Sequence, residues 1–322
     1  MSRPPDKGGG ASLAKRGRGV LPDEKSAPRS SPEKEAIGVI GLGTMGSAMS
    51  ANLVQAGFRV HGFDVLAPQR EELKKSGGMP ATSTAAVAQL AEVLITSLPS
   101  AEALHAVAEE LLGKGRVVME TSTLPIADKE RARDTLAKKG IVLLDCPLSG
   151  TGAQARAKDL VVFASGDEAA FRKIETHLPG FSRAHYFLGQ FGNGSRMKFV
   201  ANLLVAIHNV STAEAFVLGM KAGLDPKTIY EVMANSAGAS RMFQVRGPQM
   251  VANKYDDATI SVQLFQKDMK IIGEFATQLG VPTPLFNTSA TIYNAAMAQG
   301  HAKEDTAAVC AVLETLAGTR RP

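Results

Sequence analysis

The chain has 322 residues, of which 44% are hydrophobic and 21% are charged, and its formal net charge is +5 at pH 7. This composition is typical of a globular protein and gives enough length for two domains with cores of their own. No apolar run approaches the roughly 20 residues that cross a bilayer, so we expect no membrane span. Two cysteines, Cys146 and Cys310, exclude a disulfide framework and a cysteine metal site. Because no signal-peptide core follows Met1, we expect a cytoplasmic protein.

The positive charge is concentrated at the start of the chain. Residues 1–36 carry eight Lys or Arg against five acids, which is +3 of the total +5, and the remaining charges alternate in sign. This distribution predicts no dedicated nucleic-acid surface. The same 36 residues are rich in Pro, Gly and Ser, so we predict a disordered tail. The five acids argue against an Arg-rich transit peptide, which is typically poor in acids.

A G-x-G-x-x-G motif follows the first predicted strand, residues 36–40. Its glycines allow a tight turn, a close approach of the backbone to a pyrophosphate, and close packing of the next helix on the strand. A second strand, 59–63, ends at Asp64, where an acid accepts ribose hydroxyls and repels a 2′-phosphate. We therefore predict NAD rather than NADP, and the alternative is a structural glycine turn beside a surface aspartate. The predicted cofactor-binding residues are Gly41, Leu42, Gly43, Thr44, Met45, Gly46 and Asp64.

Strands and helices continue to alternate beyond Asp64, which predicts a parallel sheet with right-handed crossovers. The predicted strands are 93–96, 117–120, 142–145, 160–165 and 184–188, with a helix at 168–177. Ligands of such sheets bind beyond the carboxyl ends of the strands, so Leu98, Pro99 and Thr123 are candidate cofactor contacts. Helix capping before Pro125 is a second role open to Ser122 and Thr123.

Two further stretches suit a small ligand. The strand at 142–145 leads into a loop of small polar residues, 146–155, whose hydroxyl and backbone N–H donors suit a carboxylate. A predicted helix from Ser195 to about Ala222 places Lys198 and Asn202 four residues apart, on the same face. Taken alone, Lys198 is more typical of a solvated lysine in the first turn of a helix.

No strand pattern reappears after this helix. Residues 226–234, 261–279, 284–299 and 306–317 have helical periodicity, which predicts an all-helical second domain suited to dimerisation. Lys267 and Asp268 form a charged pair within an apolar pattern and are either an exposed patch or part of the site. Residues 241–243 either cap the pocket or pack between helices.

Six motifs, taken together and in this order, resemble the β-hydroxyacid dehydrogenase family. They are Gly-x-Gly-x-Met-Gly at 41–46, Leu98-Pro99, Ser122-Thr123, Asp-x-Pro-x-Ser-Gly at 145–150, Gly-x-Gly-x-x-x-Lys-x-x-x-Asn at 192–202, and Lys267-Asp268. The resemblance implies a Rossmann domain at 37–194, an all-α domain at 195–318, and an active site between them. It also implies that Lys198 is the catalytic acid/base, that Ser149, Gly150 and Asn202 hold the substrate, and that Thr123 and Lys267 contact the cofactor.

The chain departs from the family pattern in the loop at 149–155. Thr151 stands where a second glycine is usual, and Gln154 adds an amide, so we expect Thr151 to influence which small carboxylate is bound. We predict a homodimer or homotetramer that requires no metal. Two alternatives are an imine-reducing relative, against which Lys198 argues, and a non-catalytic NAD-binding or chromatin-associated relative.

Overall fold

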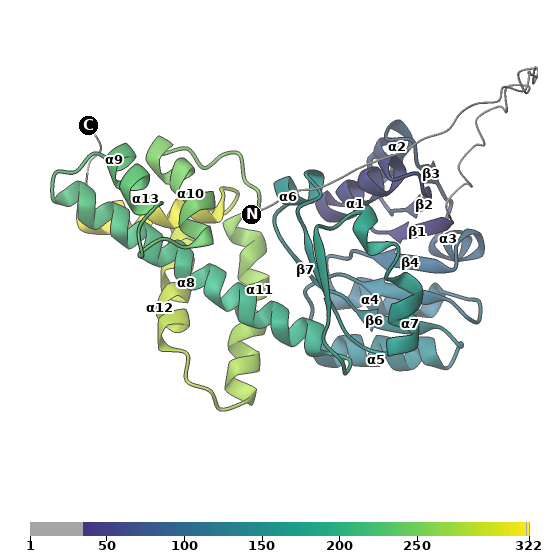
Figure 1. Ribbon diagram of the computed structural model, residues 1–322. Helices are drawn as coiled ribbons and strands as arrows, with labels where there is room; N and C mark the ends of the chain where they lie inside the picture. The colour runs from purple at the N-terminus through teal and green to yellow at the C-terminus, as the bar shows by residue number, and fades with distance from the viewer. Residues whose placement is uncertain (1–34, 320, 322) are drawn as a thin grey trace, which may run out of the picture. The chain divides into compact units, whose positions relative to one another are not determined.

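The computed structural model describes residues 35–319 and residue 321, so most of the tail predicted at 1–36 lies outside the described residues. The first part of the described chain alternates strands and helices (Figure 1). The elements are β1 (Ala36–Ile40), α1 (Thr44–Gln55), β2 (Arg59–Phe63), α2 (Ala67–Lys75), β3 (Met79–Pro80), α3 (Thr84–Leu90), β4 (Val93–Thr96), α4 (Ala101–Glu110), β5 (Val117–Glu120), α5 (Ile126–Ala137) and β6 (Val142–Asp145).

These strands form one parallel sheet in the order β3-β2-β1-β4-β5-β6. The central strands are short apolar runs that are buried on both faces, as parallel sheets require. Val93 and Ile95 of β4 pack into one core cluster and Leu94 packs into another, so each face of the sheet has its own core. The strand order reverses between β1 and β4, which is where doubly wound sheets bind ligands. The predicted Rossmann-type fold is confirmed.

A second sheet lies beyond β6 in the sequence. Its strands are β7 (Leu148–Ser149), β8 (Val161–Ala164) and β9 (Ala184–Phe187), with α6 (Gly152–Arg156) and α7 (Glu168–Ile174) between them. β7 is antiparallel to β8, and β8 is parallel to β9. The strands predicted at 160–165 and 184–188 therefore exist, but they belong to a separate sheet. An isolated antiparallel bridge between Asp145 and Ser165 links the end of β6 to the end of β8.

The remaining elements of the described chain are helical, as predicted. They are α8 (Asn193–Lys221), α9 (Pro226–Met233), α10 (Arg241–Ala252), α11 (Val262–Gln278), α12 (Pro284–Ala298) and α13 (Val309–Ala317). The sequence pattern does not predict α10, because Gly247 and Pro248 lie inside this helix and both disfavour helical structure. A Cβ on Gly247 would lie 2.5 Å from the Tyr230 ring, so the close contact between α10 and α9 requires this glycine.

The structure shows which of the two roles considered for residues 241–243 applies to Phe243. Phe243 is buried and stacks on the rings of Phe216 and Tyr230, at centroid distances of 5.5 and 5.8 Å. Arg241 is exposed and lies 4.0 Å from the carboxylate of Asp159. Phe243 is therefore a packing residue of the helical core, which is the second of the two roles.

Helix α8 agrees to within two residues at each end with the helix predicted from Ser195 to about Ala222. Its 29 residues include an 18-residue window of mean hydropathy 1.5, so by length and composition alone it could cross a membrane. The prediction of no membrane span is based on unbroken apolar runs, and the apolar residues of α8 are interrupted by polar ones such as Asn202 and His208. Five helices, α9, α10, α11, α12 and α13, pack against α8, and this packing explains its apolar composition as that of a core helix.

Candidate active site

The turn between β1 and α1 has the geometry of a dinucleotide-binding turn. Gly41 has a φ of +89°, and a Cβ on it would lie 2.2 Å from the Ser97 carbonyl oxygen. A Cβ on Gly46 would lie 1.9 Å from the Gly41 carbonyl oxygen, so this glycine allows α1 to pack closely on the turn. Apart from Gly43 itself and its two neighbours in the chain, no heavy atom of the described residues lies within 4 Å of a Cβ placed on Gly43. The three glycines thus provide the tight turn, the close packing and the open approach that a pyrophosphate requires.

Asp64 lies directly beside this turn. Its Oδ2 accepts a hydrogen bond from Leu42 N at 2.7 Å, and its Oδ1 accepts one from Leu66 N at 2.9 Å. The side chain of Leu42 is buried in the core, and Met45 packs against the same core, so Leu42 meets Asp64 through its main-chain N–H. Thr44 is exposed at the first turn of α1. The glycine turn and the acid after β2 therefore form one unit, which fits a dinucleotide.

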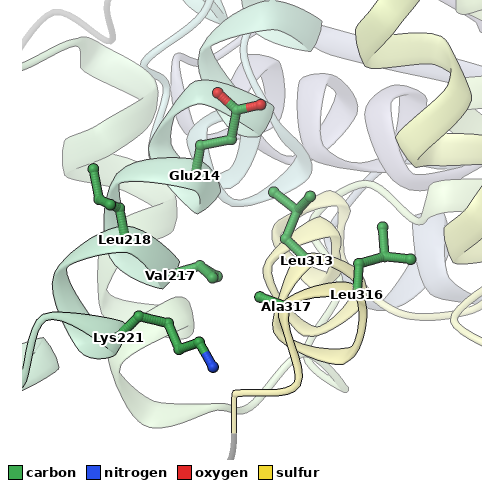
Figure 2. Close-up of a pocket in the computed structure, with 7 residues that line it drawn as sticks. All are labelled: Glu214, Val217, Leu218, Lys221, Leu313, Leu316 and Ala317. Carbon is green, nitrogen blue, oxygen red and sulfur yellow. The ribbon is translucent and has the colours of Figure 1, made fainter.

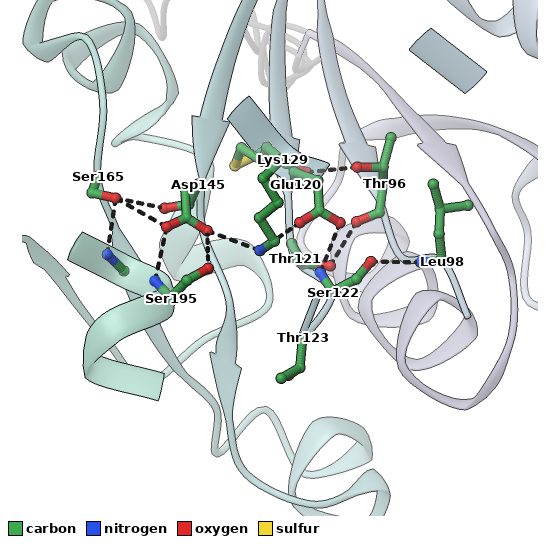
Figure 3. A network of polar contacts seen from close by, with 12 residues as sticks. Thr96, Leu98, Glu120, Thr121, Ser122, Thr123, Lys129, Asp145, Ser165 and Ser195 are labelled. Atoms are coloured by element: carbon green, nitrogen blue, oxygen red, sulfur yellow. Dashed lines mark hydrogen bonds and ion pairs between the residues drawn. The ribbon is translucent and has the colours of Figure 1, made fainter. Parts of the chain in front are cut away.

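The ends of β4 and β5 are joined by a hydrogen bond from Leu98 N to Ser122 Oγ at 2.8 Å (Figure 3). Leu98 Cδ2 lies 3.2 Å from a Cβ built on Gly41, which brings this strand end to the glycine turn. Helix α5 has no side-chain cap, so Ser122 does not have the capping role considered for it. Pro99 follows directly and precedes Ser100, whose hydroxyl caps α4.

Lys198 and Asn202 are both buried on the same face of α8, with 8% of Lys198 exposed. Asn202 Nδ2 donates to Asp268 Oδ2 at 2.8 Å. Burial lowers the pKa of Lys198 below its ordinary value, and the positive charge of Lys267 lowers it further, whereas the Asp268 carboxylate opposes this shift. Within residues 35–319, no side chain donates to or accepts from Lys198 Nζ in a hydrogen bond, so the amine is free to meet a ligand.

Lys267 and Asp268 are not an exposed patch. Lys267 Nζ donates to the Thr123 carbonyl oxygen at 2.8 Å and lies 3.7 Å from Asp268 Oδ1. Asp268 is 7% exposed, and burial raises its pKa. The sequence left Asp268 as either surface or site and assigned it no role; its position one residue after Lys267, within an apolar helical pattern, was the available signal. The contacts connect Thr123, Lys267, Asp268 and Asn202 in one cluster beside Lys198.

The loop after β7 holds the remaining predicted substrate residues. Ser149 ends β7, which contacts α8, and Gly150 has a φ of +138°. Thr151 caps α6 by accepting from Gln154 N at 3.3 Å, and Gln154 Oε1 accepts from Thr151 N at 3.0 Å. This reciprocal pair is a capping box, so both side chains hold the loop's shape. The cap uses the Thr151 hydroxyl as an acceptor and leaves its hydrogen free to donate.

This loop also lies against the dinucleotide turn. A Cβ on Gly152 would lie 2.7 Å from Thr44 Cγ2 and 3.8 Å from the Thr259 carbonyl oxygen. Asn52 Nδ2 of α1 donates to the Ala155 carbonyl oxygen of α6 at 2.7 Å. The loop at 149–155 is therefore attached to the helix that follows the glycine motif.

A surface pocket of about 440 Å³ lies elsewhere, between the C-terminal part of α8 and α13 (Figure 2). Its lining residues are Glu214, Val217, Leu218, Lys221, Leu313, Leu316 and Ala317. Glu214 follows Lys198 by 16 positions on α8, which corresponds to about 24 Å along a helix. This pocket is distinct from the Lys198 cluster. In the part of the chain that the structure describes, no group of three His, Cys, Asp or Glu residues is arranged to hold a metal ion.

Two family models match the chain in sequence. Residues 36–189 match the NAD binding domain of 6-phosphogluconate dehydrogenase, and residues 192–313 match the NAD-binding domain of NADP-dependent 3-hydroxyisobutyrate dehydrogenase. The two matches together cover both the sheet region and the helical region. A nicotinamide cofactor is therefore supported by the family models as well as by the glycine turn.

Characterised relatives match over nearly their whole length. L-threonate dehydrogenase of Cupriavidus necator is 32% identical over 85% of this chain and 94% of that protein. The mitochondrial 3-hydroxyisobutyrate dehydrogenase of Mus musculus is 31% identical over 87% of this chain and 88% of that protein. The crystal structure of 3-hydroxyisobutyrate dehydrogenase from Salmonella typhimurium is similar with a TM-score of 0.79, at 29% identity, over 87% of this chain and 100% of that one. The chain belongs to the β-hydroxyacid dehydrogenase family of nicotinamide-dependent oxidoreductases.

Proposed function

We propose that this enzyme oxidises a small β-hydroxy acid, or reduces the corresponding semialdehyde or keto acid, with Lys198 as the general acid/base. The observation that carries the proposal is the buried Lys198 amine, with its lowered pKa, beside Asn202 and Asp268. For oxidation, the neutral amine takes the proton of the substrate hydroxyl. For reduction, the ammonium returns a proton to the same oxygen. When bound, a nicotinamide ring supplies the hydride acceptor or donor.

Five residues support a substrate that carries a carboxylate. Ser149, the Gly150 N–H and Thr151 offer donors at the loop after β7, and Asn202 and Thr123 lie in the cluster beside Lys198. A carboxylate held by the loop would leave the hydroxyl-bearing carbon free to approach the Lys198 amine. The substrates named for the relatives, L-threonate and 3-hydroxyisobutyrate, are both small hydroxy acids.

The proposed reaction is tested by screening small hydroxy acids with NAD and semialdehydes with NADH, while NADH absorbance is followed. The same screen is run on Lys198→Met. We expect turnover of at least one small β-hydroxy acid by the wild type and its loss in Lys198→Met, with NADH binding retained in a fluorescence titration. Turnover by Lys198→Met within tenfold of the wild type would remove Lys198 from the mechanism.

We propose further that the cofactor is NAD rather than NADP. Gly41–Gly46, Leu98, Pro99, Thr123 and Lys267 would hold the dinucleotide, and Asp64 would meet the adenosine ribose. A 2′-phosphate at that ribose would face the Asp64 carboxylate, whose two oxygens already accept N–H donors from Leu42 and Leu66. Replacement of Asp64 by Ser should change the ratio of kcat/KM values in favour of NADP by about tenfold or more, which corresponds to about 1.4 kcal/mol. A wild-type enzyme with a lower KM for NADP than for NAD would contradict this assignment.

We also infer that two copies associate through the pocket face of α8 and α13. Leu218 and Leu316 are 73% and 64% exposed there, although both are large apolar residues (Figure 2). Glu214 and Lys221 lie on either side of Leu218 on the same helix. In a two-fold antiparallel contact centred near Leu218, each Glu214 would face Lys221 of the second copy, so the face complements itself.

This inference is tested by sedimentation velocity on the full chain. Leu218→Glu should lower the association state, and Leu279→Glu, which changes a leucine that is 61% exposed at the end of α11, should not. A wild-type monomer, or an unchanged state in Leu218→Glu, would contradict the inference. A tetramer that falls to a dimer in Leu218→Glu would show that this face is one of two interfaces.

We place the enzyme in a reducing cytoplasm. Cys146 and Cys310 are both buried free thiols, and burial raises the pKa of each. A high thiol pKa favours the unreactive protonated form. Fractionation of cells that express the full chain would test this placement.

A further inference from the structure

Two buried carboxylates end neighbouring strands of the main sheet and share one lysine. Glu120 and Asp145 are the last residues of β5 and β6, and they are partners in the strand register. Lys129 Nζ of α5 lies 2.6 Å from Glu120 Oε2 and 2.8 Å from Asp145 Oδ1. All three side chains are fully buried, and Figure 3 shows the lysine between the two acids. We call these three residues the strand-end triad.

The Glu120 side of the triad holds the loop after β5. Glu120 Oε1 accepts a hydrogen bond from Ser122 N at 2.9 Å. Ser122 Oγ in turn accepts from Leu98 N at 2.8 Å, and the Thr123 carbonyl oxygen accepts from Lys267 Nζ at 2.8 Å. The triad is thus bonded to the segment that we assign to the cofactor.

The Asp145 side of the triad holds the first turn of α8. Asp145 Oδ2 accepts from Ser195 N and Oδ1 accepts from Ser195 Oγ, each at 2.8 Å. These bonds make Asp145 a cap for α8 from 50 residues away, and its negative charge suits the positive end of the helix. A Cβ on Gly194 would lie 2.7 Å from the Asp145 carbonyl oxygen, so the contact is close. Lys198 follows Ser195 by three residues, about one turn.

We propose that Lys129 is a positioning residue that sets the distance between the Ser122–Thr123 loop and the Lys198-bearing turn of α8. Lys129 touches neither substrate nor cofactor in this assignment and acts through Glu120 and Asp145. Apolar residues of similar volume stabilise a buried site as well as an ion triad does, so stability by itself does not require three charges here. The carboxylates of the triad accept hydrogen bonds from the Ser122–Thr123 loop and from the first turn of α8. The reaction requires these two segments to be aligned. This proposal rests on the proposed role of Lys198.

The double variant Glu120→Gln/Lys129→Met tests the proposal. The triad carries a net charge of −1, and this variant keeps that charge on Asp145, with its two bonds to Ser195. The amide oxygen introduced at position 120 still accepts from Ser122 N, so only the link through the ammonium is lost. We expect kcat to fall by about tenfold or more, because misplacement by about 1 Å costs up to about a hundredfold. The KM for NAD should change by less than about threefold, because the glycine turn is untouched.

The pH dependence of kcat supplies a readout that a purely structural role would not move. The charged groups that face Lys198 are Asp268 and Lys267, both on α11. If the first turn of α8 loosens, water reaches Lys198 and its pKa rises towards its ordinary value. The rise of kcat with pH in the oxidation direction should therefore move to higher pH in the double variant.

Tyr293→Phe is the matched control, because it removes a buried hydrogen bond from Asn209 in the helical core. We expect it to lower the melting temperature but to keep kcat and the pH profile. If the double variant does not fold, Ser195→Ala removes a single bond to Asp145 and should give a smaller fall in kcat with the same direction of pH shift. A kcat and a pH profile equal to those of the control would overturn the proposal.

Measuring Lys198→Met in the same assays distinguishes an error in the acid/base role of Lys198 from an error in the positioning role of Lys129. If Lys198→Met keeps turnover, the proposed acid/base is wrong, and the proposal for Lys129 fails with it. If Lys198→Met is inactive and the double variant behaves like Tyr293→Phe, only the positioning role of Lys129 is wrong.

Discussion

Lys129 and Lys198 are both buried lysines with a carboxylate nearby, yet their pKa values move in opposite directions. Lys129 lies between Glu120 and Asp145, and these two acids outweigh the cost of burial, so its pKa is raised. Lys198 feels one carboxylate, Asp268, and also a second ammonium, Lys267, so the cost of burial prevails and its pKa is lowered. The first lysine stays a cation, and the second gives up its proton more readily than an ordinary lysine.

The difference shows that burial alone does not reveal the role of a lysine. A buried ammonium with two acceptors at hydrogen-bonding distance is a structural ion. A buried amine that faces one carboxylate and one ammonium has a lowered pKa, which is the property that a general base requires. The following predictions test this contrast, from the largest expected effect to the smallest.

Replacement of Lys198 by Met should reduce kcat by about 10²–10⁴-fold, the usual contribution of a general acid/base. The same change should leave the melting temperature unchanged or raise it, because it removes a buried amine whose charged form is disfavoured. Steady-state kinetics and thermal unfolding measure the two effects. If Lys198→Met lost as much free energy of unfolding as it lost in activation free energy for kcat, Lys198 would be a structural lysine like Lys129.

Replacement of Lys129 by Met should lower the free energy of unfolding by about 3–5 kcal/mol, because it leaves two adjacent buried carboxylates without their cation. The raised pKa of Lys129 means that rising pH does not reduce its contribution below 10.5, the ordinary lysine value, and removes it only as the lysine loses its proton above that pH. Urea unfolding measures the loss. Lys270→Met, which removes an exposed ion pair with Glu274, is the control and should cost less than about 1 kcal/mol. Equal losses in the two variants would contradict the structural role.

Replacement of Asp268 by Asn should shift the pH profile of kcat for oxidation to lower pH. The Asp268 carboxylate holds the pKa of Lys198 up, so its neutralisation lowers that pKa and provides the neutral amine at lower pH. Asn keeps an oxygen that can accept from Asn202. Glu274→Gln makes the same chemical change at an exposed position of α11 and should leave the profile in place. A shift to higher pH would show that Asp268 does not act on Lys198.

Particular elements show how far the sequence could predict this structure. The strands β1, β2, β4, β5 and β6 were predicted at their observed bounds, because short apolar runs between glycine-rich or polar segments are local signals. Helix α10 was missed because its interior Gly-Pro pair disfavours a helix locally, whereas its packing on Tyr230 and Phe216 favours one. Thr151 and Gln154 were interpreted as possible substrate contacts, and the structure gives them a capping box as well.

The sequence by itself determined five of the six strands of the main sheet, the glycine turn, the acid at Asp64 and the shared helix face of Lys198 and Asn202. Each of these depends on residues within about one element of one another, so periodicity and glycine conformation reveal them. Only the tertiary structure decided that Asp268 lies beside Asn202 and that Lys129 joins Glu120 to Asp145. These contacts join residues that are far apart in the chain, and the pKa of each lysine depends on the number and sign of the charges that the fold brings to it.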